Sequence, residues 1–294
     1  SLPAPQCSGL SSTRPRGFFP TIPYPSIYES LIISGTYIGC RSVQDLSFRY
    51  SDDGPWILND MSLFIPAGKC LALIGLNGIG KSTFVKLITR LYDQQKGSIK
   101  WDGIDIREFD PIQFREHLGV IFQDFMRYEL TVQENIGLGN LQSLNDMNHI
   151  KEAAEHAKIN EKISQLPSGY QSILSRWMAK NDEGVEFSGG EWQKIALARM
   201  FMRNADLWLV DEPTAALDAK AEYDLYRSFT QLFSKKTTVL ISHRFSTVRV
   251  ADLIAVLADG KVVEYGSHNE LLDQKGEYEE LFRLQTKQNQ FSHT

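Results

Sequence analysis

The sequence of 294 residues contains no apolar run approaching the roughly 20 residues that a membrane-spanning helix requires. Its longest apolar runs, such as LIAVLA at 253–258, have the length of a strand. Basic residues are not in excess either, because 31 lysines and arginines stand against 36 aspartates and glutamates, for a formal net charge of −5. We therefore expect a chain that does not cross a bilayer by itself and that has no nucleic-acid partner.

Cysteine is also scarce. The three cysteines, Cys7, Cys40 and Cys70, are odd in number and show no CxxC spacing. This pattern argues against both a disulfide framework and a zinc site, and a reducing, cytosolic setting fits it best.

Helical and strand periodicity are missing from residues 1–35, where six of the 11 prolines occur among Ser, Gly and Thr. The same segment lacks the basic start and apolar core of a signal peptide. We predict a flexible proline-rich arm or linker over residues 1–35.

Two kinds of strand pattern follow this segment. VQDLSFRY (43–50) and MSLFI (61–65), separated by turn residues, indicate an antiparallel β layer. The uninterrupted apolar runs at 69–75, 207–212 and 237–242 are typical of a parallel sheet that is covered by helices on both faces. We predict an α/β fold with helices at 81–91, 149–158, 191–203 and 219–234 and an inserted, mostly helical subdomain over about 125–185.

The stretch GLNGIGKST (75–83) follows an apolar strand, precedes a predicted helix and matches the phosphate-loop pattern G-x-x-x-x-G-K-[ST]. Backbone N–H groups of such a loop surround a β-phosphate, Lys81 can reach the β- and γ-phosphate oxygens, and Ser82 can offer its hydroxyl to Mg²⁺. The predicted nucleotide-binding residues are Gly75, Leu76, Asn77, Gly78, Ile79, Gly80, Lys81, Ser82 and Thr83.

A carboxylate pair ends the apolar strand LWLVDE (207–212). Asp211 is placed to hold the Mg²⁺ shell, and Glu212 to orient and deprotonate an attacking water. Gln123 and His243 also follow apolar runs, where an amide can contact the metal and an imidazole can bind a γ-phosphate oxygen. Taken singly, each of these residues could instead be ordinary surface at the end of a strand.

A second glycine-rich bend, EFSGGEWQ (186–193), opens another predicted helix but has no lysine where a phosphate loop needs one. By itself it resembles half of a phosphate site.

Taken together, these motifs resemble the nucleotide-binding domain of ATP-binding cassette (ABC) transporters, from about Ile38 to Gln285. In this resemblance Tyr50 is the aromatic residue that stacks on adenine, although a tyrosine beside a turn could equally be edge packing. The remaining correspondences are GLNGIGKST for the Walker A motif, Gln123 for the Q-loop, FSGGE (187–191) for the signature, LWLVDE for Walker B, AALD (215–218) with Asp218 for the D-loop, and His243 for the switch histidine.

The resemblance implies a P-loop NTPase of the RecA-like type with ATP and Mg²⁺ as cofactors. It implies catalytic roles for Glu212, His243 and Gln123 and metal contacts from Ser82, Gln123 and Asp211. Two nucleotide-binding domains, identical or different, would pair head to tail, and each ATP would also contact the partner's signature. The signature residues that would make this contact are Ser188, Gly189, Gly190 and Glu191.

The sequence around Gln123 and after residue 257 is similar to that of exporters in which this domain is fused to a transmembrane domain. The implied function is ATP-powered export at the cytoplasmic face of a membrane. Segments 125–130 and 176–183 would receive the transmembrane domain, although their apolar residues could equally form the helical subdomain's core. The expected domains are a nucleotide-binding domain over 36–290, with its helical part at about 125–190, and a tail over 291–294.

Two other functions compete with export. One is a soluble ABC ATPase of translation or DNA repair, although such proteins normally carry tandem cassettes or a coiled-coil insertion. The other is a regulatory module that binds nucleotide without hydrolysing it. We also note that the signature carries Glu191 where glutamine is usual, which would place a negative charge near a triphosphate.

Overall fold

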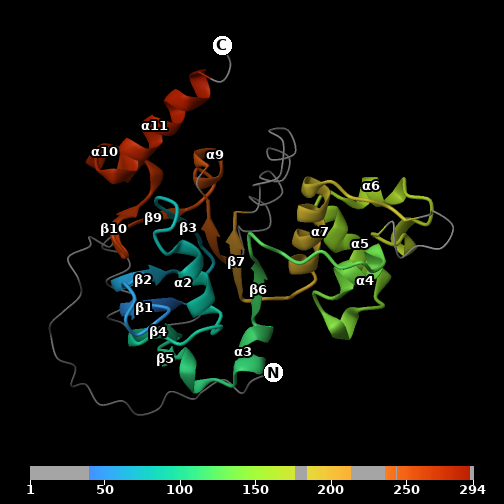
Figure 1. Ribbon diagram of the computed structural model, residues 1–294, viewed down its shortest axis with the longest axis horizontal. Coiled ribbons are helices and arrows are strands. Elements are labelled where there is room, and N and C mark those ends of the chain that lie inside the picture. The colour runs from blue at the N-terminus through green and yellow to red at the C-terminus, as the bar shows by residue number, and fades with distance from the viewer. Residues whose placement is uncertain (1–39, 176–183, 213–235, 243, 292–294) are drawn as a thin grey trace.

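Two β-sheets form the centre of the computed structural model, which describes residues 40–175, 184–212, 236–242 and 244–291 (Figure 1). The larger sheet has the strand order β10-β9-β3-β8-β7-β6, and only β10 runs antiparallel to its neighbour. Its strands are β3 (Cys70–Ile74), β6 (Leu118–Ile121), β7 (Leu207–Asp211), β8 (Thr237–Ile241), β9 (Leu253–Ala258) and β10 (Lys261–Gly266). The predicted parallel-sheet core is therefore confirmed.

The smaller sheet is antiparallel, with the order β2-β1-β4-β5. Its strands are β1 (Arg41–Phe48), β2 (Leu58–Ile65), β4 (Lys96–Trp101) and β5 (Ile104–Asp105). Helix α2 (Lys81–Ile88) places Phe84 and Leu87 in one apolar cluster with residues of both sheets, so the two sheets and α2 share a core. Burial of this apolar cluster holds α2 in place directly after the loop that precedes it.

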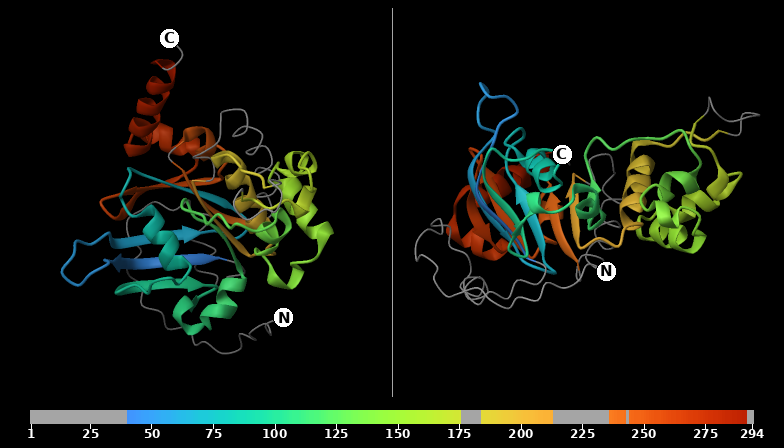
Figure 2. Two further views of the ribbon diagram at one scale, coloured as in Figure 1. Left: turned by 45° about the vertical axis from the view of Figure 1, so that its right-hand side comes forward. Right: turned by 90° about the horizontal axis from the view of Figure 1, so that it is seen from below.

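A helical lobe lies to one side of the sheets (Figure 2). It consists of α4 (Val132–Gly137), α5 (Met147–His156), α6 (Asn160–Ser164) and α7 (Gly189–Phe201), with 3₁₀ turns η2 (Leu141–Ser143) and η3 (Gly169–Gln171). Ile150 of α5 and Ile195 of α7 belong to an apolar cluster that continues into Val210 of β7, so the lobe is anchored to the sheet by packing.

The remaining helices of the described fold are η1 (Ile106–Glu108), α3 (Pro111–Glu116), α9 (Phe245–Val248), α10 (His268–Gln274) and the longer α11 (Glu277–Phe291). In the part of the chain that the structure describes, no helix combines the length and apolarity needed to span a membrane.

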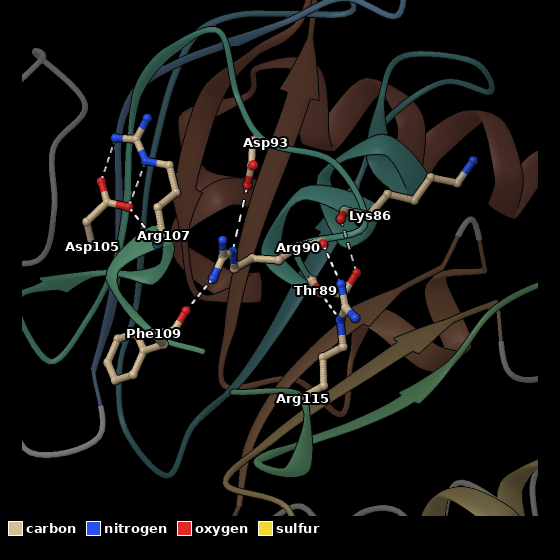
Figure 3. A network of polar contacts seen from close by, with 8 residues as sticks. All are labelled: Lys86, Thr89, Arg90, Asp93, Asp105, Arg107, Phe109 and Arg115. Atoms are coloured by element: carbon tan, nitrogen blue, oxygen red, sulfur yellow. Dashed lines mark hydrogen bonds and ion pairs between the residues drawn. The ribbon is translucent and has the colours of Figure 1, made fainter. Parts of the chain in front are cut away.

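The predicted helix over 81–91 is shorter than expected and ends at Ile88. Arg90 adopts a left-handed backbone with φ of 54°, which terminates the helix. The Arg115 guanidinium donates to the carbonyls of Thr89 at 3.2 Å and Arg90 at 2.7 Å, and Arg90 donates to Phe109 O at 2.7 Å (Figure 3). A cation at this end is favourable to the helix dipole, and the contacts hold α2 against the segment 105–115.

Residues 125–130, at the start of the predicted helical subdomain, form no helix themselves, and the first helix after them is α4. Their backbone groups are bound by side chains instead: Asn135 Nδ2 donates to Tyr128 O at 2.9 Å and Arg199 donates to Met126 O at 3.2 Å. The predicted helices over 149–158 and 191–203 exist with boundaries shifted by about two residues, as α5 and α7. The predicted helix over 219–234 lies outside the described residues.

Candidate functional site

The loop 75–80 connects β3 to α2 and has the backbone that its glycines require. Gly75 has φ of 149°, and a Cβ there would collide with the carbonyl oxygen of Leu257. Gly78 has φ of 79°, and no atom lies within 4 Å of the position that a Cβ would take. The loop therefore combines tight packing at its base with an open side at Gly78, which allows a ligand to approach its backbone.

Lys81, the first residue of α2, folds back over this loop. Its ammonium donates to the carbonyl of Gly75 at 2.8 Å and to that of Leu76 at 2.9 Å, and the residue is only 6% exposed. Burial lowers the pKa of Lys81, while the nearby Glu212 and Asp211 raise it in opposition. An anion entering the loop would meet a cation already in place, whose present partners are neutral carbonyl oxygens.

A pocket of about 580 Å³ opens beside the loop and gathers residues from three elements. It is lined by Asn77, Gly78, Gly80, Lys81, Ser82, Thr83, Gln123 and Glu212. Gln123 comes two residues after β6, and Glu212 directly follows β7. The sequence-predicted phosphate, metal and water-activating residues thus meet at the carboxyl edge of one parallel sheet, where ligands of such sheets bind.

Asp211 ends β7 with its side chain buried at 2% exposure. Burial raises the pKa of Asp211, a hydrogen bond from Ser82 lowers it, and the charge of Glu212 raises it further. One carboxylate oxygen, Oδ1, is buried and has no hydrogen-bond partner. A buried carboxylate with an unused oxygen next to a serine hydroxyl is a suitable donor set for Mg²⁺.

Among the described residues, no group of three or more His, Cys, Asp or Glu comes together as a metal cage. Mg²⁺ does not need one, because it commonly takes one or two protein oxygens and completes its octahedron with substrate phosphates and water. Ser82, Gln123 and Asp211 fit that requirement.

Hydrogen bonds hold the backbone of Glu212 at both its N–H and its carbonyl. It adopts a left-handed conformation with φ of 49°, its N–H donates to Ile241 O at 2.9 Å, and its carbonyl accepts from Gln193 Nε2 at 3.1 Å. Gln193 lies on α7 and is only 3% exposed. An unusual backbone conformation that neighbours fix in place is common at functional sites. The sequence analysis did not identify Gln193.

Tyr50 lies next to the start of α2, as a residue that contacts bound nucleotide would. Its hydroxyl is 3.1 Å from Thr83 Oγ1, and its ring packs edge-on against Phe48 and Tyr92 with centroids 5.0 Å and 5.4 Å away. The side chain is still 50% exposed. The ring is thus fixed beside the pocket while one part of it remains available to a planar ligand.

Ser188, Gly189 and Gly190 form the start of α7, with Ser188 as the N-cap. A reciprocal capping box joins Ser188 to Glu191. The Ser188 N–H donates to Glu191 Oε2 at 2.8 Å, and the Glu191 N–H donates to Ser188 Oγ at 3.3 Å. Such a box satisfies helix N–H groups that otherwise have no partner.

The other oxygen of Glu191, Oε1, lies 3.1 Å from Lys162 Nζ, which comes from α6. Burial on its own would raise the pKa of Glu191, but the Ser188 backbone N–H and Lys162 outweigh it and leave this pKa lowered. The unusual glutamate of the signature is therefore ionised and paired. Sequence analysis missed Lys162, although the S-x-x-E pattern of the capping box was visible.

The signature residues do not line the pocket with the phosphate loop; they lie at the start of α7 in the helical lobe (Figure 1). The expected contact of these residues with a second copy's nucleotide stays a prediction. His243 and Asp218 lie outside the described residues.

The chain is similar in sequence and in fold to known proteins. The family described as ABC transporter matches residues 58–215. Among relatives, the putative multidrug export ATP-binding/permease protein YgaD of Bacillus subtilis is 38% identical over 82% of this chain. The ATP-dependent lipid A-core flippase of Syntrophus aciditrophicus is 39% identical over 84% of it, and the subtilin transport ATP-binding protein SpaT of Bacillus subtilis is 39% identical over 78%.

A solved structure of a bacterial Atm1-family ABC exporter with ATP bound superposes on 84% of this chain with a TM-score of 0.76 and 34% identity. The chain spans only 37–42% of the length of these four proteins. The matched region contains the phosphate loop, Gln123, the signature and Walker B residues in the family's order. The chain belongs to the ABC transporter family and carries the ATP-binding domain of that family.

Proposed function

We propose that this chain is the Mg²⁺-dependent ATP hydrolase of an ABC exporter, and that two such domains close on ATP and reopen after hydrolysis. The observation that carries the proposal is the pocket in which Lys81, Gln123 and Glu212 meet around the phosphate loop. Cation, amide and carboxylate are the three groups that phosphoryl transfer to water requires at one place.

In this proposal the N–H groups from Asn77 to Lys81 and the Lys81 ammonium bind the β- and γ-phosphates. Ser82, Gln123 and Asp211 would hold Mg²⁺, which would supply positive charge to balance the negative charge of the phosphates. Glu212 accepts a proton from the attacking water, and His243 contacts a γ-phosphate oxygen. Tyr50 stacks on the adenine.

The pairing of two domains rests on the position of the signature. Ser188, Gly189 and Gly190 present a helix N-terminus without a lysine of their own, so they suit a phosphate whose lysine belongs to another subunit. The partner is a second nucleotide-binding domain, identical or different, and Asp218 of the D-loop belongs to the same contact. Closure and reopening of the pair would supply the movement that drives transport.

Export is supported by the relatives, whose names describe multidrug export, subtilin transport and lipid A-core flipping. These names do not support the alternative of a soluble ATPase of translation or DNA repair. The chain would act at the cytoplasmic face of a membrane. We also propose an arm over 1–35, a nucleotide-binding domain over 36–290 with its helical part at about 125–190, and a tail over 291–294.

We propose that the transmembrane domain docks between the sheets and the helical lobe. A cavity of about 260 Å³ is lined by Phe122, Leu138 and Arg199, among others. Next to it Met126 is 61% exposed, and Tyr128 and Leu130 are exposed as well, whereas Phe125 packs against the helical core. The first half of the expected docking region, 125–130, is therefore mostly accessible, and its other half, 176–183, lies outside the described residues.

Phosphate release from ATP tests the enzymatic part of this proposal. We expect turnover in Mg²⁺ that stops when EDTA is added. Absence of turnover, even after reconstitution with a transmembrane partner, would indicate a binding module without hydrolytic function.

A further inference from the structure

The first turn of α7 carries a full negative charge at the point where the proposed function requires an anion to bind. The N-terminus of a helix attracts phosphate through its free N–H groups and its dipole. A carboxylate in the same turn opposes this attraction, since like charges a few ångströms apart repel strongly where water is excluded. Glu191 is that carboxylate.

Lys162 is the cation that pairs with this negative charge. Its ammonium lies 3.1 Å from Glu191 Oε1, and it comes from α6, a different helix of the lobe. The Glu191 side chain is 23% exposed and that of Lys162 is 46% exposed, so the pair lies at the lobe surface. When a partner subunit covers this surface, water that now screens both charges is removed and the pairing becomes stronger.

We propose that Lys162 is a positioning residue of the signature, which neutralises Glu191 and fixes its carboxylate so that the phosphate-facing end of α7 can accept the partner's ATP. The inference rests on the proposed head-to-tail pairing and deepens it. It also explains why glutamate is compatible with this signature, because glutamate and lysine together present no net charge.

Lys162 has a second effect, which acts through Ser188. In the free chain the Ser188 hydroxyl donates to Glu191 Oε2 at 3.0 Å. To donate to a phosphate, this hydroxyl must turn away from Glu191. The carboxylate then keeps two contacts, the Ser188 N–H at Oε2 and Lys162 at Oε1, which stop it from following the hydroxyl toward the phosphate. Lys162 thus keeps the Glu191 carboxylate in place when the Ser188 hydroxyl turns toward the phosphate.

Dimerisation in ATP tests this proposal, measured by sedimentation of the 294-residue chain with the hydrolysis-blocking substitution Glu212→Gln. Lys162→Met should weaken the dimer by about fivefold or more, the size of a typical coupling between sites. Lys162→Arg, which keeps the charge, should stay within about twofold of the parent. Lys151→Met, the loss of an exposed lysine of α5 in the same lobe, is the control for net charge.

The decisive comparison is made in the Glu191→Gln background. Glutamine still completes the capping box but carries no charge. Removing Lys162 there should alter dimerisation by less than about twofold, as a double-mutant cycle requires when one residue acts through the other. The penalty of Lys162→Met in the parent should also shrink as salt is raised.

An equal penalty in both backgrounds would overturn the inference, since it would mean that Lys162 contacts the nucleotide or the partner directly. So would an absence of any penalty in the parent. If the Glu212→Gln chain does not pair at all at saturating ATP, it is the proposed pairing that fails, and the role of Lys162 fails with it.

Discussion

Gln193 of the signature helix donates a hydrogen bond of 3.1 Å to the backbone carbonyl of Glu212, the residue that follows Walker B strand β7. In the proposed function, the first turn of α7 meets the partner's ATP and Glu212 serves this chain's own ATP. The same helix would then contact, one turn after its start, the backbone of that carboxylate. A shift of α7 would reach Glu212 without an intermediate residue.

Gln193→Met keeps the length of the side chain and removes the donor. We expect turnover to fall by about tenfold to a hundredfold, because misplacing a catalytic group by an ångström costs this much, while the KM for ATP changes little. Steady-state kinetics with a melting curve of each variant checks the prediction. A parallel rise in KM, or a loss of turnover explained by unfolding, would contradict a positioning role.

Lys81→Met should lower the affinity for ATP by about a hundredfold, since the variant loses its charge-assisted contacts to phosphate and the only lysine among the described residues that line the pocket. Lys69→Met removes an equal charge at the opposite end of β3 and is the matched control. Binding of a fluorescent ATP analogue measures both. Similar affinities for the two variants would disprove the placement of the triphosphate.

Asp211→Asn should stabilise the chain in the absence of Mg²⁺ and nucleotide. Because burial raises the pKa of Asp211, the folded chain binds its proton more tightly than the unfolded chain does. The ionised carboxylate therefore costs stability at pH values above the folded pKa, and this cost fades as the pH falls through it. The melting temperature should rise by about 2–4 °C at neutral pH, a usual size for one substitution.

The advantage of Asp211→Asn should shrink in acid and reverse when Mg²⁺ and ATP are added, because the parent alone can use the carboxylate for the metal. A stabilisation that is independent of pH, or equal gains from Mg²⁺ and ATP in both proteins, would argue against this role for Asp211.

Tyr50→Ala should weaken ATP binding by about tenfold, within the range of aromatic stacking on a base, and should leave inorganic triphosphate binding unchanged. Tyr50→Phe keeps the ring and loses only the contact with Thr83. It should therefore bind ATP almost as the parent does. Equal losses for ATP and triphosphate would show that Tyr50 acts through Thr83 rather than through the base.

Much of the fold and of the pocket could be predicted from sequence because the relevant signals are local. The phosphate loop at 75–83 and the strand ending in Asp211 are contiguous segments, and a parallel sheet brings their ends to one edge. The end of α2 was missed because Arg90 takes a backbone conformation usual for glycine or asparagine.

The pairs Lys162–Glu191 and Gln193–Glu212 could not be predicted in the same way. Lys162 and Glu191 meet through their side chains, and the Gln193 side chain meets the backbone carbonyl of Glu212. Both contacts join separate segments, so they depend on how α6 and the end of β7 are placed against α7. Of the contacts made by Glu191, only the capping box with Ser188 has a local signal in the sequence, the S-x-x-E spacing.

The substitution Glu212→Gln tests the central claim most directly. It preserves shape and removes the proton acceptor, so the account predicts that ATP hydrolysis falls by at least about a hundredfold, that ATP still binds, and that the chain sediments as a dimer in ATP. Full hydrolytic activity in this variant would contradict the assignment of the base. A chain that binds ATP and remains monomeric would contradict the head-to-tail pairing.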